Sequence, residues 1–299
     1  MRWVTWGLLG LAGLACLAFF WLWWSNEPPR ASVGEAKSLS QGEDVYSYFA
    51  RGSGPIVVLL PSLGRAASDF NELVFALNEA GYRTLALDPP GTGDSVLGDT
   101  EGVTLHTLAA GVDRIVQAET AGDEKIVVLG HAFGNRVART YATDYPDRVA
   151  ATVLLAAGGK VDIEPRILQA LTRSFWTFMP DAWRREEVRL AFFSGDNPIP
   201  DYWMAGWSVP TAFIQGPATT NTPSEEWWHG GNAPILVVQA LDDTIAPPEH
   251  TSALLKEEFG DRVTVAETGG AGHALLPEQP EKIAEAVSGF LRTHLPPGR

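Results

Sequence analysis

Two patterns of hydrophobic and polar positions alternate along this 299-residue chain from about residue 55 onward. Short, uninterrupted apolar runs are typical of strands that are buried on both faces. Between them, apolar residues recur at spacings of three and four, as in Leu73, Val74 and Leu77, and this spacing predicts helices with one apolar face. The alternation of strands and helices predicts an α/β fold with a parallel, doubly wound sheet.

The apolar runs predict strands at residues 55–61, 82–88, 125–131, 149–157, 234–240 and 262–268. An alternating run at 44–54 predicts an early antiparallel strand. Helices are expected at residues 69–81, 104–122, 134–145 and 280–295.

The strand and helix pattern breaks between about residues 158 and 232, a stretch rich in tryptophan and phenylalanine. The stretch is too long for a plain loop in a compact domain. We therefore expect a helical cap inserted between two strands. Its aromatic side chains either hold the cap on the sheet or line an apolar pocket for a hydrophobic small molecule, and the sequence leaves both uses open.

Residues 3–24 form an uncharged apolar stretch that ends in several tryptophans. A helix of this length spans about 33 Å, enough to cross a membrane. The stretch favours an uncleaved anchor over a signal peptide, whose apolar part is shorter and closed by small residues. Arg2 before it and Glu27 after it place the main domain outside the cytoplasm, as in a periplasmic protein. We therefore expect a membrane anchor and linker at 1–30 and an α/β domain at 31–299.

The net charge of −14, with no basic cluster, excludes nucleic acid as an expected partner. The only cysteine, Cys16, lies in the apolar N-terminal stretch, so we expect neither a disulfide nor thiol chemistry in the domain. The six histidines show no metal-ligand spacing, and we expect no metal site.

The segment Val127–Arg136, VVLGHAFGNR, leads a strand into a turn with a glycine two positions on either side of Ala132. This pattern is typical of a nucleophile elbow, whose central residue is normally serine. The N–H of the following residue, Phe133, is then expected to bind an oxyanion. Because Ala132 has no nucleophilic atom, the sequence excludes an acyl-enzyme at this position.

Two further strand ends carry a carboxylate and an imidazole. Asp243 follows the strand at 234–240, and His273 lies in a glycine-rich loop after the last strand. A carboxylate that accepts the N–H of a histidine holds it in the tautomer that a general base needs. The chain order of elbow, acid and histidine matches a known hydrolase order and favours this pair. Asp242 and Asp162 remain alternatives for the carboxylate.

The loop LLPSLGRAASDF, after the strand at 55–61, is placed to supply a second oxyanion donor, for which the amide of Leu63 is the candidate. Ser62 beside it is a candidate substitute nucleophile, although a serine at such a position more often caps a turn. His131, one position before the elbow centre, is expected to be a packing residue.

The motifs LLPSLGR, DPPGTGDS, GHAFGN, LDDTIAP and GAGHALL together resemble the α/β-hydrolase superfamily, from about Gln41 to the C-terminus. The resemblance implies a mostly parallel eight-stranded sheet with helices on both faces, a helical cap, no cofactor and a Ser–Asp–His triad. By position, Asp243 and His273 match the acid and the base. Leu63 and Phe133 match the oxyanion donors.

The chain departs from the pattern of this superfamily at four places. Ala132 stands in place of the nucleophile, and Pro61 with Ser62 in place of His-Gly. Pro90 and Asn135 replace a usual arginine and a common glycine.

Three functions are consistent with this pattern. In the first, a hydrolase acts on a hydrophobic ester-like or other acyl or carbonyl compound through a general-base pair and backbone donors, without a serine nucleophile. In the second, a non-catalytic protein binds a hydrophobic ligand at a membrane surface, or a protein partner. In the third, Ala132 is an engineered replacement of serine in an esterase or lipase. The retained glycines and the His–Asp pair favour the first.

Overall fold

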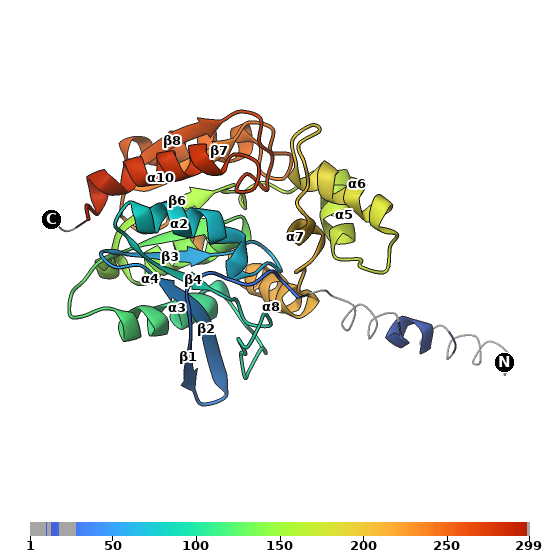
Figure 1. The fold of residues 1–299 in the computed structure, drawn as a ribbon, viewed down its shortest axis with the longest axis horizontal. Helices are drawn as coiled ribbons and strands as arrows, with labels where there is room; N and C mark the ends of the chain where they lie inside the picture. The colour runs from blue at the N-terminus through green and yellow to red at the C-terminus, as the bar shows by residue number, and fades with distance from the viewer. Residues whose placement is uncertain (1–9, 11–12, 18–27, 298–299) are drawn as a thin grey trace.

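The computed structural model describes residues 10, 13–17 and 28–297, which form an α/β structure (Figure 1). Within these residues lies an eight-stranded sheet with the order β1-β2-β4-β3-β5-β6-β7-β8. Strand β2 runs antiparallel to both of its neighbours, and all the other adjacent pairs are parallel. The predicted mostly parallel, eight-stranded sheet is confirmed.

The predicted strands and helices are present, with ends that differ by at most about three residues because helix and strand termini fray. The strands are β1 (Glu35–Gln41), β2 (Asp44–Arg51), β3 (Ile56–Leu60), β4 (Arg83–Leu87), β5 (Ile126–His131), β6 (Val149–Leu155), β7 (Ile235–Ala240) and β8 (Val263–Thr268). The helices outside the expected cap are α2 (Asn71–Glu79), α3 (Leu105–Glu119), α4 (Phe133–Asp144), α9 (Ser252–Phe259) and α10 (Pro280–His294).

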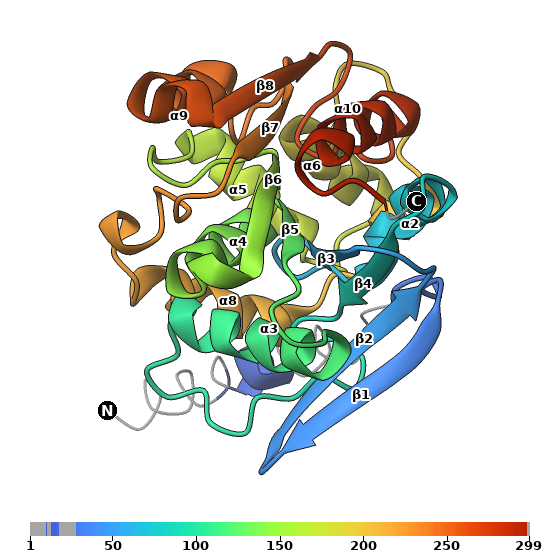
Figure 2. The same ribbon diagram turned by 90° about the vertical axis from the view of Figure 1, so that its left-hand side faces the viewer.

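Helices cover both faces of the sheet (Figure 2). The side chains of α3, α4 and α9 share one hydrophobic core with the sheet, and those of α2 and α10 share a second core on the opposite face. Strand β3 shows why its sequence is continuously apolar. Successive side chains of a strand point to opposite faces, and Val57 and Leu59 enter one core while Val58 and Leu60 enter the other.

Strand β1 was not predicted from the sequence. Its residues, EAKSLSQ, are mostly polar and exposed, so they give no burial signal. The strand exists because it pairs along its whole length with β2 at the edge of the sheet.

The segment expected to be a cap contains α5 (Pro165–Ser174), α6 (Asp181–Phe192), α7 (Asp201–Met204) and α8 (Val209–Thr220). In Figure 1, α5, α6 and α7 lie together beside the sheet, and their buried side chains form a third core. In this core, the Phe192 ring lies 5.4 Å from that of Trp203 and 5.2 Å from that of Trp207, centroid to centroid. Aromatic packing therefore builds the interior of this segment.

The structure contradicts the prediction of an N-terminal membrane anchor and of an extracytoplasmic domain behind it. Among the helices of the described residues, none is both long and apolar enough to cross a membrane. Most of the predicted span, residues 3–24, lies outside the described residues.

Candidate active site

The turn between β5 and α4 has the strained backbone of a nucleophile elbow. Ala132 adopts φ 49° and ψ −108°, a positive φ that residues other than glycine rarely adopt. The flanking glycines have a steric cause. A Cβ atom on Gly130 would overlap the backbone of Gly134, and one on Gly134 would overlap the carbonyl group of Leu60. The turn thus presents a methyl group where the pattern expects a hydroxyl.

Hydrogen bonds hold this turn in place. The Ala132 amide donates to the carbonyl oxygen of Leu155, at the end of the neighbouring strand β6, over 2.9 Å. The side-chain amide of Asn135 donates to the carbonyl oxygens of Ala132 and Ala156. Asn135 is fully buried, so its amide replaces water as the partner of these carbonyl groups. The departure from the usual glycine therefore has a structural role in this chain.

His273 and Asp243 lie together in a buried pair. Nδ1 of His273 lies 3.0 Å from Oδ1 and 2.9 Å from Oδ2 of the carboxylate. Oδ1 also accepts hydrogen bonds from the amides of Ile245 and Ala246, at 2.9 and 2.8 Å. These amides fix the carboxylate, and the carboxylate places the histidine proton on Nδ1. The lone pair of Nε2 is then free to accept a proton.

The other two candidate carboxylates lie elsewhere. Oδ2 of Asp242 accepts the hydroxyl hydrogen of Ser194 at 2.6 Å. Asp162 lines an outer groove and makes no hydrogen bond to His273. Of the three acids, the structure brings only Asp243 to the imidazole.

His131 lies directly behind this pair. Its Nε2 donates to the carbonyl oxygen of His273 over 2.8 Å, and the two ring centroids are 5.9 Å apart. Complete burial, followed by the charge of nearby His273, lowers the pKa of His131 to about 4. His131 is therefore neutral near pH 7. The sequence predicted a packing residue, and the structure adds that its ring supports the backbone of the histidine loop.

The cap is tied to the same loop. The amide of Ala274 donates to the carbonyl oxygen of Phe192, at the end of α6, over 2.8 Å. The Phe192 ring lies 5.9 Å from the ring of His273. A Cβ atom on Gly272 would lie only 2.7 Å from the Phe192 carbonyl oxygen, so glycine is needed there for this close approach. The aromatic end of α6 thus helps to position the imidazole.

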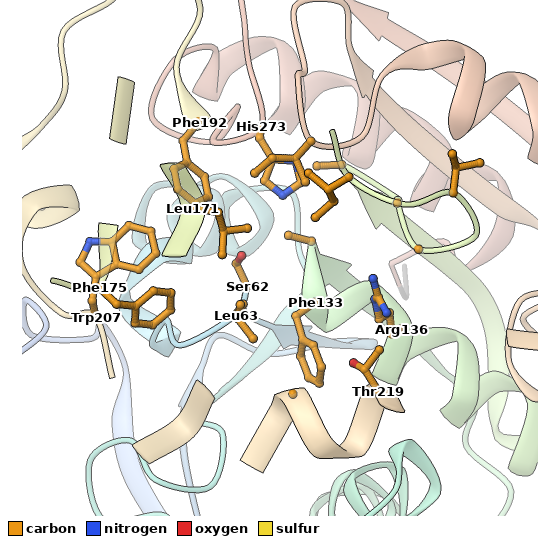
Figure 3. Close-up of a pocket in the computed structure, with 18 residues that line it drawn as sticks. Ser62, Leu63, Phe133, Arg136, Leu171, Phe175, Phe192, Trp207, Thr219 and His273 are labelled. Carbon is orange, nitrogen blue, oxygen red and sulfur yellow. The ribbon is translucent and has the colours of Figure 1, made fainter. Parts of the chain in front are cut away.

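A cavity of about 240 Å³ brings most of the predicted site residues together. Leu63, Ala132, Phe133 and His273 line it, while Asp243 lies behind the histidine. Figure 3 shows His273 at one side of this cavity, with Leu63 and Phe133 across from it. The backbone amides of Leu63 and Phe133 donate no hydrogen bond to another described residue, so both remain available to a ligand oxygen.

The cap supplies much of the apolar cavity wall. Leu171, Phe175, Phe192 and Trp207 line it, on the side away from α4 (Figure 3). Three of these residues also belong to the core of the cap, so the same aromatic side chains serve both uses that the sequence left open.

Ser62 also lies on the cavity wall and is 3% exposed. Its hydroxyl makes no hydrogen bond to His273 or to any other described residue, and its carbonyl oxygen accepts the amide of Arg65 in a turn. A serine nucleophile normally contacts its base directly. The structure therefore gives Ser62 a place in the cavity without the contact that would activate it.

Arg136, which was not among the site residues predicted from the sequence, lines the cavity from α4. The available signal was its position four residues after Ala132, because residues four apart lie on the same side of a helix.

Known proteins resemble this chain in sequence and in fold. A sequence profile of the alpha/beta hydrolase family matches residues 57–286. Pyrethroid hydrolase of Sphingobium wenxiniae is 28% identical over 258 residues, which cover 79% of this chain and 86% of that protein. The structure of an esterase from Exiguobacterium antarcticum matches with a TM-score of 0.71 at 19% identity, over 87% of this chain and 100% of that one.

Other relatives are much longer than the part that matches. Polyketide synthase ThaQ of Burkholderia thailandensis is 28% identical over 285 residues, which cover 89% of this chain but 13% of the synthase. Two further relatives are matched over 42% and 48% of their length.

Proposed function

The chain belongs to the alpha/beta hydrolase family, and we propose that it hydrolyses a hydrophobic small molecule with an ester-like or other acyl bond, using water instead of a serine nucleophile. The observation that carries the proposal is the hydrogen-bonded pair of His273 and Asp243 beside a cavity that also contains Ala132. The relative named as a pyrethroid hydrolase supports a hydrolase, and the aromatic cavity wall supports a hydrophobic substrate.

The proposed reaction needs one proton carrier. Nε2 of His273 accepts a proton from water while the water oxygen attacks the carbonyl carbon of the substrate. The negative charge that develops on the carbonyl oxygen is bound by the amides of Leu63 and Phe133. The bond to the leaving oxygen then breaks, and that oxygen takes the proton from His273, which returns to its neutral form. Asp243 stabilises the transient imidazolium.

Two neighbouring residues assist this chemistry. The methyl group of Ala132 is smaller than a serine side chain and leaves room for the attacking water. His131 is neutral near pH 7, because its pKa is lowered to about 4, so it places no second positive charge beside protonated His273.

The proposal is tested by the hydrolysis of p-nitrophenyl butyrate. We expect His273→Ala to lower kcat/KM by at least about 100-fold, the usual contribution of a general base. Asp243→Asn should lower it as well, since the amide can hold the histidine in the wrong tautomer. His250→Ala is the matched control, because His250 is exposed and lies outside the cavity. Equal rates for the His273→Ala variant and the unmodified protein would overturn the proposal.

A second experiment examines the nature of the nucleophile. Ala132→Ser should add a covalent route, with a burst of p-nitrophenol and inactivation by phenylmethylsulfonyl fluoride. The unmodified protein should show neither effect. If the unmodified protein is inactivated and Ser62→Ala abolishes this, Ser62 is the nucleophile and the water mechanism is wrong.

The second candidate function is ligand binding without catalysis, and Ala132 is the observation that favours it. Loss of the nucleophile in a comparable serine triad lowers turnover roughly 10⁶-fold. Under this alternative, the protein binds apolar esters, and its background turnover equals that of His273→Ala.

A further inference from the structure

Arg136 places a cation on the wall of a mostly apolar cavity. It lies in the first part of α4, four residues after Ala132. Figure 3 shows Arg136 beside Thr219 on one side of the cavity, with Phe175 and Trp207 on the opposite side. His273 lies between these two ends in the same view. The cavity therefore has a polar end and an aromatic end, with the candidate base between them.

The guanidinium group of Arg136 has no acidic partner among the described residues. Other arginines near the cap do have one: Arg65 pairs with Asp69, and Arg166 pairs with Glu187. The guanidinium group of Arg136 makes neither an ion pair nor a hydrogen bond with any residue that the structure describes. The ring of Trp227 lies beside it, with the ring centroid 5.5 Å from Cζ.

The neighbouring Arg139 adds a second positive charge but has a different role. It is fully buried, and its guanidinium group donates to the side chain of Asn135 and to the carbonyl oxygen of Gly158. Its own hydrogen bonds thus attach it to the backbone around the elbow. Burial lowers the pKa of both arginines, and the charge of Arg136 lowers that of Arg139 further. Two cations with no carboxylate partner in the described part of the chain therefore lie together, although the net charge of the whole chain is −14.

An unpaired charge that is largely removed from water is unfavourable, and an anion bound beside it would offset this cost. No carboxylate of the described residues forms an ion pair with Arg136, but a ligand carboxylate in the cavity can. The planar guanidinium group matches one carboxylate with two parallel hydrogen bonds. Asp162 and Glu164 line the groove that adjoins the cavity at Arg136, and their negative charges disfavour a dianionic group such as phosphate.

We propose that the substrate is an amphipathic ester with a carboxylate at one end, and that Arg136 binds this carboxylate. The apolar end lies among Phe175, Phe192 and Trp207. The scissile bond lies between the two ends, within reach of His273 and of the Leu63 amide. This inference rests on the proposed hydrolase function for the reaction, but the binding site itself requires only the cavity and the cation.

The test compares two small esters of nearly equal shape. Monobutyl succinate has an ester in its middle and a carboxylate at one end, and butyl butyrate has a methyl group in place of the carboxylate. Their affinities are measured by isothermal titration calorimetry on the full chain with His273→Ala, which keeps Arg136 and limits turnover. We expect the succinate to bind at least about tenfold more tightly, and 0.3 M salt to reduce this preference.

Substitution of the arginine should remove the preference. Arg136→Gln is expected to weaken monobutyl succinate binding about 10- to 100-fold and to leave butyl butyrate binding almost unchanged. Arg166→Gln is the matched control, because it removes the same charge from an arginine that lies outside the cavity and already pairs with Glu187. The control should keep the preference.

The proposal is overturned if Arg136→Gln retains the preference, or if the protein with Arg136 intact binds both esters equally. The comparison of the two esters on the protein with Arg136 intact needs no substitution at Arg136. It therefore tests the proposal even if the Arg136→Gln variant fails to fold. The hydrolase proposal fails separately. A protein that prefers monobutyl succinate but does not hydrolyse it faster than its His273→Ala variant has the anion site without the reaction.

Discussion

The buried imidazole of His131 makes the free energy of unfolding depend on pH in a way that one substitution removes. In the folded protein its pKa is lowered from 6.5 to about 4, first by burial and then by the charge of His273. The unfolded chain takes up this proton near pH 6.5, whereas the folded protein resists it. The stability that the neutral ring provides is therefore complete above pH 6.5 and is lost as the pH falls toward 4.

The size of the change in unfolding free energy follows from the lowered pKa of His131. At about 1.4 kcal/mol per pKa unit, the full change corresponds to about 3 kcal/mol of unfolding free energy. Between pH 8 and pH 5.5 the expected loss from this group alone is about 1 kcal/mol. Both pH values lie above the isoelectric point of about 4.8, so the protein keeps its negative charge and its solubility.

The assay is urea unfolding at pH 8 and pH 5.5, followed by tryptophan fluorescence. His131→Gln is the informative variant, because its side-chain amide can still donate to the His273 carbonyl oxygen but does not titrate. Between pH 8 and pH 5.5, the free energy of unfolding of the unmodified protein should fall by about 1 kcal/mol more than that of this variant. His250→Gln, at an exposed histidine, should behave like the unmodified protein. Equal losses for the unmodified protein and His131→Gln would refute the reasoning.

Three further outcomes follow from the structure. Gly134→Ala should lower the free energy of unfolding by more than about 3 kcal/mol in urea unfolding, because its methyl group would overlap the Leu60 carbonyl group. Phe192→Ala should cost about 3–5 kcal/mol in the same measurement and raise KM for p-nitrophenyl butyrate, since this ring contacts both the cap core and His273. Asp88→Asn should stabilise the protein at pH 8 by up to about 3 kcal/mol and have no effect below pH 4. Burial raises the pKa of Asp88 to about 6, so ionisation of this carboxyl group lowers the free energy of unfolding as the pH rises. In Asp88→Asn, the side-chain oxygen can still accept the hydrogen bond from the Ala67 amide. An unchanged free energy of unfolding at pH 8 would contradict this prediction.

The two proposals assign different work to the two ends of one short segment. In the proposed function Ala132 and Phe133 belong to the reaction centre, and in the further inference Arg136 binds the substrate. They are linked by the backbone of α4, so the strained turn that positions one amide also fixes where the cation lies. Under both proposals the turn therefore positions a backbone amide and a cation, even though its central side chain is only a methyl group.

The sequence by itself determined the layered α/β architecture and the order of the candidate site residues. Continuous apolar runs and helical spacing are local signals, because burial on two faces or on one face constrains each residue independently of its distant neighbours. The tight turn at Ala132 could also be predicted from its flanking glycines, since such a turn excludes Cβ atoms at those positions. The polar edge strand β1 gave no such signal, because its stability comes from pairing with β2 rather than from burial.

The tertiary structure decided which distant groups meet. The sequence left three acids open for His273, and only the path of the loop after β7 brings Asp243, rather than Asp242 or Asp162, to Nδ1. It also decided that Arg136 has no acidic partner among the described residues. The same aromatic side chains both build the cap and line the cavity. Such contacts depend on strand order and on loop paths between separate segments, which for Asp243 and His273 are 30 residues apart. The local hydrophobic pattern contains no information about them.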